Sequence, residues 1–324
     1  MTISVSHPNW DLDAPQPDLL LAKLSHLGLI RICGEQGHSF IQGQVTTDIS
    51  SLGKDQWRWG AHCDPKGKML ASFRIFDLDD SLFMLLPSSS IGVDLPQLQK
   101  YAVFSKAELS DVSGDWQLFG VAGDKAERFI HDTFAVTSDG AAMAGLTPIE
   151  GGAILKDGSR YLLMLSSAAA AAFEQRLDTQ VYDASAWQAL EILAAYPNLG
   201  AEHAGQYVPQ MCNLQAIDGI SFTKGCYMGQ ETIARMKYRG GNKRALYVLA
   251  GHTEAELGLD TKLEIALEDG FRRAGQIIEY VQRGQQVLLT AVLANDTQAD
   301  ARLRVADDAA SSLRVLALPY SLQD

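Results

Sequence analysis

The sequence of 324 residues has no long apolar run, no recognisable leader and no excess of positive charge. No stretch approaches the ~18 consecutive apolar residues that a membrane-spanning helix requires. The first residues lack the basic start and the apolar centre of a secretory signal. We therefore expect neither a membrane segment nor export.

Closely spaced cysteines are also missing. Four cysteines stand far apart, and none forms a C-x-x-C pair: Cys33, Cys63, Cys212 and Cys226. This spacing argues against a disulfide framework and against a zinc or iron–sulfur site borne by the protein, so we expect no metal. A reducing cytoplasmic location fits such cysteine usage best.

Positive charge is scarce over the chain as a whole. The formal net charge is −12. Proteins that hold nucleic acid across a broad surface are usually basic, because phosphate neutralisation dominates their affinity. The charge therefore argues against extensive RNA binding, although it leaves room for one local basic patch.

The order of short apolar stretches and turn residues predicts four parts. Residues 1–17 are polar and proline-rich, as in a poorly ordered tail or an extended arm. The ranges 18–114 and 115–243 alternate strands with helices. Over 244–324, strands separated by Gly, Asp and Asn turns predict a small antiparallel barrel or sandwich.

The two middle parts share a pattern. Gly34 precedes Phe40-Ile41 at the same spacing at which Gly123 precedes Phe129-Ile130. Each glycine follows a predicted strand and opens a predicted helix. We infer a degenerate duplication of a ferredoxin-like β-α-β-β-α-β unit, which makes the fold class α+β with a C-terminal β-domain.

Some element boundaries can also be predicted. The patterns favour a strand at Met69–Leu78, a helix at Ser90–Tyr101 and an extended stretch at Ala102–Leu109. A further helix is expected from Met228 to about Met236, with Glu231 and Arg235 paired across one turn.

The segment from Lys224 to Arg244 is the most unusual part of the chain. It carries six basic residues and one acid, so its net charge is +5 while the rest of the chain carries −17. Such a concentration of positive charge should attract an anion, whether a polyglutamate tail, phosphate, RNA or an acidic partner. The alternative is an ordinary solvated face.

Cys226 is the candidate reactive residue of this segment. Gly225 and Gly229 allow tight turns on both sides of it. A thiol next to Lys224 and close to a helix N-terminus would have its thiolate form favoured. The alternative is that Cys226 is simply a small packing residue.

Together these residues resemble the signature K-G-C-Y-x-G-Q-E-x-x-x-R-x-K of the YgfZ family. The matching residues are Lys224, Gly225, Cys226, Tyr227, Gly229, Gln230, Glu231, Arg235 and Lys237. The resemblance covers nearly the whole chain, with further blocks at residues 42–46, 61–64, 66–69, 100–105, 219–222 and 319–322.

The YgfZ family in turn resembles the T-protein of glycine cleavage. That resemblance implies three domains in a ring around a central hole that holds a folate such as tetrahydrofolate. Trp187 matches a family tryptophan associated with the folate pocket, although on its pattern alone it is an ordinary helix core residue. A second family tryptophan of this pocket is replaced here by Leu27.

The resemblance also bears on catalysis. T-proteins carry an acidic pair where this chain has Ala71 and Ser72. Neither side chain can serve as a charged proton acceptor of matched pKa. We therefore expect the folate pocket to be retained and T-protein aminomethyl transfer to be absent.

The resemblance implies a folate-binding accessory protein that supports iron–sulfur enzymes or their assembly, and thereby tRNA methylthiolation, without gripping tRNA itself. One alternative is a folate-dependent one-carbon transferase with Cys226 as nucleophile. Another is a direct tRNA-binding module. Its basic residues would be Lys224, Arg235, Lys237, Arg239, Lys243 and Arg244.

Overall fold

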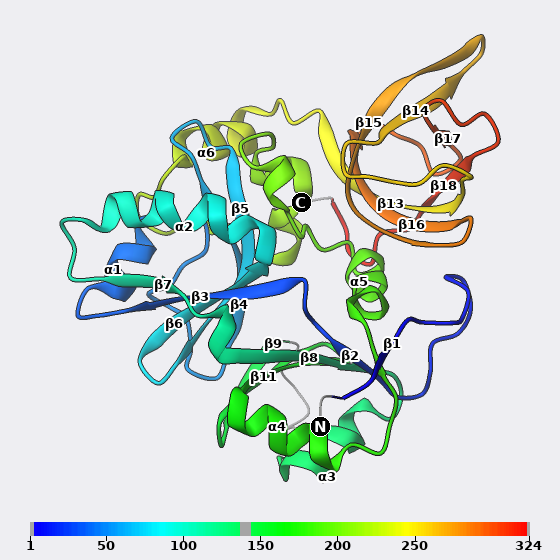
Figure 1. Ribbon diagram of the computed structural model, residues 1–324. Coiled ribbons are helices and arrows are strands. Elements are labelled where there is room, and N and C mark those ends of the chain that lie inside the picture. Colours follow the sequence, from blue (N-terminus) through cyan, green and yellow to red (C-terminus); the bar gives the residue numbers. More distant parts are fainter. Residues whose placement is uncertain (1–2, 137–143, 323–324) are drawn as a thin grey trace.

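The computed structural model describes residues 3–136 and 144–322 of the chain. Figure 1 shows two α+β units, at the left and at the bottom, and a β-barrel at the upper right. Helix α5 (Ala184–Leu193) lies where the three bodies meet. Among the described residues, no helix is long and apolar enough to cross a membrane.

The first unit is a five-stranded sheet with two helices on one face. Its strand order is β4-β5-β6-β3-β7. The elements are β3 (Leu27–Cys33), α1 (Gly37–Gln42), β4 (Trp57–Cys63), β5 (Met69–Leu78), β6 (Ser81–Pro87), α2 (Ser88–Ala102), β7 (Glu108–Asp111) and the short 3-10 helix η1 (Ser113–Asp115).

The second unit is a seven-stranded sheet in the order β1-β12-β2-β8-β11-β10-β9. Its elements are β1 (Val5–Ser6), β2 (Leu20–Lys23), β8 (Trp116–Ala122), α3 (Ala126–Phe134), β9 (Ala144–Ile149), β10 (Gly152–Asp157), β11 (Arg160–Ser166), α4 (Ser167–Arg176) and β12 (Val181–Tyr182). The N-terminal residues thus form an extended arm, and the strands β1 and β2 hold both ends of this arm in the second sheet.

The strand orders confirm the duplication. The run β9-β10-β11-β8 repeats the run β4-β5-β6-β3. Gly34 and Gly123 both have left-handed φ angles, of 98° and 97°. Gly34 lies against the carbonyl of Lys106, and Gly123 lies against the carbonyl of Asp18. A Cβ would therefore not fit at either position.

Two details of the repeat differ from the sequence prediction. Each unit has three consecutive strands between its helices, so the repeat is β-α-β-β-β-α-β. In the second unit, β2 pairs with β8 in the position that β7 takes beside β3, and β12 lies one place further out. The strand β2 falls within the range 18–114 but joins the second sheet.

Two boundary predictions were wrong. The stretch Ala102–Leu109 is not extended throughout, because α2 continues to Ala102 and the amide of Ser105 donates to the carbonyl of Ala102 at 2.8 Å. Helix α6 (Gln230–Arg239) begins two residues later than expected. The cause is Gly229, whose left-handed φ of 79° cannot continue into a helix.

The C-terminal domain is a closed antiparallel barrel, as predicted. Its strands follow the order β13-β16-β15-β14-β17-β18. They are β13 (Arg244–His252), β14 (Lys262–Leu267), β15 (Gly270–Arg283), β16 (Gln286–Ala294), β17 (Arg302–Val305) and β18 (Ser312–Leu316). The last of these was missed, because it is short and its alternation fades at Val315 and Leu316, which are both half-buried.

The layers explain where a site can form. Helices α1 and α2 cover the outer face of the first sheet, and α3 and α4 cover the outer face of the second. The inner faces of both sheets and α5 share one central core. The connection after α5 holds η2 (Ala201–His203), η3 (Pro209–Cys212), η4 (Leu214–Ile217) and α6.

Candidate functional site

A cavity of about 690 Å³ opens between the two units and the connection that follows α5. A volume of this size suits a small-molecule ligand. Strand β4, the loop before it, β10 and residues 196–223 supply its walls. The residues that line it are Thr47, Asp48, Ser51, Gln56, Trp57, Arg58, Trp59, Asp157, Tyr196, Ile217, Asp218, Ser221 and Thr223.

Three aromatic side chains form one wall of this central cavity. Trp57 and Trp59 are alternate residues of β4, so both point to its inner face. The Trp59 ring lies 4.9 Å from the ring of Tyr196 and 6.2 Å from that of Trp57. The ring planes of Trp57 and Trp59 are inclined by 77° and those of Trp59 and Tyr196 by 51°, so a planar ligand would stack on one of these rings and meet the others at an angle.

A buried guanidinium lies behind this wall. The Arg74 guanidinium carbon is 4.3 Å from the centre of the Trp59 ring and 5.2 Å from that of Tyr196. Arg74 donates to both oxygens of Glu191, at 2.9 and 2.8 Å, and reaches Asp157 at 3.4 Å. A cation held against the rings fixes their positions and polarises their faces.

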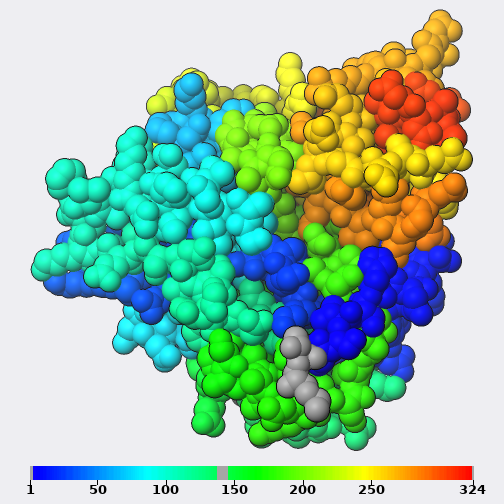
Figure 2. Space-filling view, in the orientation of Figure 1, coloured from blue at the N-terminus to red at the C-terminus, as the bar shows by residue number. Residues whose placement is uncertain are grey.

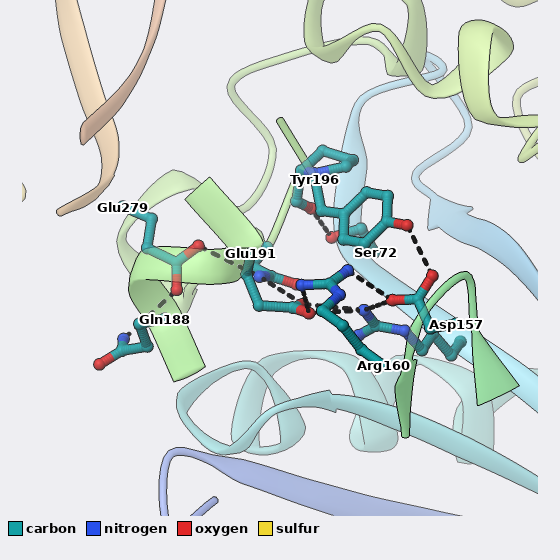
Figure 3. Close-up of polar contacts among 10 residues, drawn as sticks. Ser72, Asp157, Arg160, Gln188, Glu191, Tyr196 and Glu279 are labelled. Atoms are coloured by element: carbon teal, nitrogen blue, oxygen red, sulfur yellow. Dashed lines mark hydrogen bonds and ion pairs between the residues drawn. The ribbon is translucent and has the colours of Figure 1, made fainter. Parts of the chain in front are cut away.

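Further polar groups extend the cluster to all three bodies (Figure 3). Arg160 donates to Asp157 at 2.6 Å, and Tyr196 donates its hydroxyl proton to Asp157 at 2.7 Å. Asn198 bridges Glu191 of α5 and Glu279 of the barrel, at 3.2 and 3.1 Å. The junction of the three bodies is therefore polar and mostly hydrogen-bonded.

The two carboxyl groups bridged by Asn198 differ in protonation. Burial opposes ionisation of Glu191, but Arg74 and Arg160 outweigh it and lower the pKa of Glu191. Burial raises the pKa of Glu279 to about 8, and the nearby Glu191 charge adds to this effect. At neutral pH, Glu279 is therefore a protonated hydrogen-bonding group.

Some buried polar atoms at this junction have no partner among the described residues. They include the indole Nε1 of Trp59 and the Nε of Arg74. Buried donors are nearly always hydrogen-bonded in folded proteins. Both atoms are also buried from the central cavity, so neither is a donor that a ligand would reach in this structure.

The two residues predicted for the folate pocket lie in the central core. Trp187 of α5 is fully buried, its ring is packed on Gly120, and the Arg160 guanidinium carbon is 5.2 Å from its centre. Leu27 is 7% exposed and belongs to the same core. Neither residue is among those that line the central cavity.

Ala71 and Ser72 both have structural surroundings. Ala71 faces the core beneath α1 and α2. Ser72 points the other way, donates to the carbonyl of Pro197 and accepts the amide of Leu199 at 3.0 Å. The hydroxyl of Ser72 therefore holds the chain between α5 and η2.

The Lys224-Gly225-Cys226-Tyr227 segment is docked against the first unit. Lys224 donates to the carbonyls of Val45 and Thr47, at 2.8 and 2.6 Å. Burial lowers the pKa of Lys224 to about 8, which the Asp48 charge partly offsets. Because Thr47 lines the central cavity, Lys224 ties this segment to the cavity wall.

Close backbone contact fixes the other end of the segment. A Cβ on Gly229 would lie 2.7 Å from the Cα of Gly67 and 2.8 Å from the carbonyl oxygen of Asp64. The amide of Met228 donates to the carbonyl of Gly43 at 3.1 Å. Only glycine allows this approach, so Gly229 sets the start of α6 against the β4–β5 turn.

Cys226 is the exposed cysteine of the four, and it follows the cavity-lining residues Ser221 and Thr223 by a few positions. Cys63 and Cys212 are buried, and burial raises the pKa of both thiols. In the described parts of the chain, no group of three or more His, Cys, Asp or Glu side chains could hold a metal ion.

The other residues of the signature have separate tasks. Tyr227 is buried in the central core, and open space surrounds Gly225. Gln230 begins α6, and the predicted pair forms at 2.6 Å between Arg235 and Glu231. The Lys237 ammonium lies 4.2 Å from the centre of the Phe222 ring. The basic residues are thus partly engaged within the protein.

The aromatic wall of the central cavity was not predicted from the sequence. Two signals for it were present. Trp57 and Trp59 alternate on one predicted strand, and Arg74 stands in the middle of the mostly apolar strand β5. An arginine buried in a strand needs partners, and such a residue is a reason to look for a polar junction.

Comparison with known proteins identifies the family. Residues 14–150 match the GCVT N-terminal domain, and residues 242–308 match the YgfZ beta-barrel domain. A tRNA-modifying protein YgfZ of Colwellia psychrerythraea is 37% identical over 99% of both chains. That of Vibrio vulnificus is 40% identical over 95% of this chain and 94% of its own. The chain belongs to the YgfZ family.

Solved structures confirm the expected fold. The aminomethyltransferase T of the glycine cleavage system from Bartonella henselae superimposes with a TM-score of 0.69. The match covers 93% of this YgfZ-family chain and 86% of the other, at 15% identity. The T-protein-like arrangement of two related units and a barrel is thus established for this member.

Proposed function

We propose that this YgfZ-family protein binds a reduced folate, such as tetrahydrofolate, in the central cavity. The observation that carries the proposal is the cavity wall of Trp57, Trp59 and Tyr196, with Arg74 behind it. A pterin needs a flat aromatic surface and a few polar groups at its edge. The carboxylate of Asp157 and the other polar side chains of the cavity lining can supply such groups.

Trp187 and Leu27 then support the pocket from the core. Trp187 packs behind Arg160, which in turn holds Asp157 at the cavity wall. In this arrangement the aromatic contact with the ligand comes from β4. Trp187, the tryptophan matched through the family resemblance, instead packs against Arg160 and so supports the polar cluster.

We further propose that folate binding serves tRNA modification through iron–sulfur enzymes, with an indirect effect on tRNA. The relatives named above are called tRNA-modifying proteins. The part played by iron–sulfur enzymes rests on the family resemblance. The exposed Cys226, which follows the cavity-lining Thr223 by three positions, is the group through which a partner could be engaged.

Calorimetric titration with tetrahydrofolate tests the ligand. We expect saturable binding of one equivalent, weakened at least tenfold by Trp59→Phe. Trp116→Phe is the matched control, because Trp116 is half-buried, packs edge-on against Phe83 and does not line the cavity. Absence of binding by the wild type, or equal affinity of Trp59→Phe, would overturn the proposal.

Complementation of a deletion strain tests the cellular role. The wild-type gene should restore tRNA methylthiolation and the activity of an iron–sulfur enzyme, and Trp59→Phe should restore both only partly. If Cys226→Ala restores both in full, the thiol has no part in this role. If the wild type restores neither, the cellular proposal is wrong even where folate binds.

The second candidate function is folate-dependent one-carbon transfer with Cys226 as nucleophile. It is favoured by the exposure of this thiol a few residues after the cavity wall. Incubation with a folate one-carbon donor decides it. Consumption of many equivalents, lost in Cys226→Ser, would support an enzyme, whereas consumption of one equivalent or less would exclude turnover.

A further inference from the structure

A second cavity lies between the N-terminal arm, α5 and the barrel. Its volume is about 580 Å³, and it shares no lining residue with the central cavity. In Figure 2 the dark blue arm lies beneath the yellow and orange barrel, at the side of the molecule away from the first unit. We refer to this second cavity as the arm cavity.

The walls of the arm cavity are largely apolar. From α5, Ala186, Ala189 and Leu193 face it from one side of the helix. From the barrel, Val287 and Leu288 of β16 contribute. The small alanine side chains leave space that the barrel does not fill, so the cavity suits an apolar molecule.

The arm is a fixed wall of this cavity. The amide of Leu12 donates to Oε1 of Gln286 at 2.8 Å, and Arg283 donates to the carbonyl of Trp10 at 2.7 Å. The Trp10 ring meets Tyr182 edge-on at 4.8 Å. Because these bonds hold the arm to the barrel and to the second unit, the cavity does not depend on a bound ligand for its outline.

Two arginine side chains, Arg283 and Arg314, belong to the lining of the arm cavity. Arg283 lies with its guanidinium carbon 5.0 Å from the centre of the Trp10 ring and donates from one terminal nitrogen to the Trp10 carbonyl, whereas its Nε is buried away from the cavity. His252 also lines this cavity, and among the described residues of the lining Asp13 is the acidic one. Burial lowers the pKa of Arg283, although Asp183 and Asp11 oppose this.

An apolar cavity with an arginine in its lining suits one chemical class of ligand. We propose that the arm cavity binds a small amphipathic carboxylate, with its aliphatic or aromatic body against α5 and β16 and its carboxylate at Arg283. A carboxylate accepts charge-assisted hydrogen bonds from guanidinium, and its body removes apolar surface from water. The site is separate from the proposed folate pocket.

Calorimetry with decanoate as the probe tests the arm cavity. We expect one equivalent to bind saturably below ~1 mM, a range open to a ligand of this size. Leu193 is 41% exposed and lines the cavity, so Leu193→Trp should fill it and weaken binding at least tenfold. Leu267→Trp is the matched control, since Leu267 is 48% exposed on β14 and lies outside the cavity.

Two further comparisons test the role of charge and the separation from folate. Decanol, which lacks the carboxylate, should bind at least fivefold more weakly to the wild type, and Arg283→Gln should remove that difference. Tetrahydrofolate affinity should be the same with and without decanoate, and in Leu193→Trp. That last result also shows that the variant is folded.

The proposal is overturned if decanoate shows no saturable binding, or if Leu193→Trp binds it as well as Leu267→Trp does. It is also overturned if decanol binds as tightly as decanoate. Competition between decanoate and tetrahydrofolate would mean one shared site and would contradict the proposal. Loss of tetrahydrofolate binding by the wild type would leave the decanoate result unaffected, because the two cavities share no lining residue.

Discussion

At the scale of single residues, buried charge is the main feature of this protein. Arg74 lies in the middle of β5 and is only 1% exposed. Its side chain faces two carboxylates and three aromatic rings. A buried ion pair need not add net stability, because desolvation offsets attraction. Its value here is positional, since it fixes the cavity wall.

Replacing Arg74 should destabilise the fold, because the substitution leaves the buried carboxylates that pair with Arg74 without this counter-charge. We expect Arg74→Met to lower the free energy of unfolding by about 3–5 kcal/mol, because Glu191 loses its main counter-charge. Urea denaturation measures this. Arg235→Met is the control: its pair with Glu231 is exposed, and such pairs contribute about 0–1 kcal/mol. Similar losses in both variants would contradict the positional role.

Glu279 gives the protein a pH dependence of known sign. Between its unfolded pKa of about 4.3 and its folded pKa of about 8, the native state binds a proton that the unfolded state has released. Stability should therefore fall as pH rises through this window, by up to about 1.4 kcal/mol per pH unit. Glu279→Gln should flatten this slope.

Urea midpoints at intervals from pH 5 to 8.5 check this expectation. Gln keeps hydrogen-bonding groups within reach of Asn198 and Gln188 and carries no charge at any pH. The relevant quantity is the difference in slope between wild type and variant, since other groups titrate in both. Parallel slopes would show that Glu279 is not protonated in the native state.

At the scale of elements, glycine positions decide where helices begin. The helix predicted from Met228 begins at Gln230, because Gly229 adopts a left-handed conformation against Gly67. The duplicated turns at Gly34 and Gly123 follow the same rule, since each leaves room for a backbone carbonyl. Here the residue types were visible in the sequence, but the neighbour that requires glycine was not.

Gly229→Ala should lower the free energy of unfolding more than an alanine at an ordinary positive-φ glycine does, because Gly229 packs against the β4–β5 turn. A left-handed alanine costs about 1–2 kcal/mol by itself. At Gly229 the Cβ would also meet Gly67 and Asp64 below 3 Å, so we expect a larger loss. Gly284→Ala is the control, because Gly284 has φ 58° and open space around it. Thermal melts compare the two; equal losses would contradict the close contact.

At the scale of the whole molecule, charge argues against direct tRNA binding. The net charge is −12, and three basic residues of the candidate patch are already engaged. Lys224 donates to backbone carbonyls, Arg235 pairs with Glu231, and Lys237 stacks on Phe222. An engaged cation contributes less to neutralising phosphate.

We therefore expect weak tRNA binding with a shallow salt dependence. In fluorescence anisotropy between 50 and 200 mM salt, the affinity should fall much less than the ~1,000-fold or more that six or more phosphate contacts produce. A steep salt dependence with micromolar affinity would instead favour the tRNA-binding module. Replacing Arg239, Lys243 and Arg244 together would then be the test of the patch.

The sequence by itself determined the periodic part of this protein. Alternating strands, the repeated Gly34 and Gly123 pattern, the C-terminal barrel and the basic signature segment around Cys226 all follow from local residue patterns. Local patterns fix these features because side-chain periodicity and turn chemistry act over a few residues.

The tertiary structure alone decided what meets at the centre. In the tertiary structure β2 belongs to the second sheet. Trp57, Trp59 and Tyr196 line one cavity, and Trp187 is buried in the core behind that cavity. The arm also closes over a second cavity. These outcomes depend on contacts between residues more than a hundred positions apart, and the free energy of such contacts arises only when the three bodies pack together.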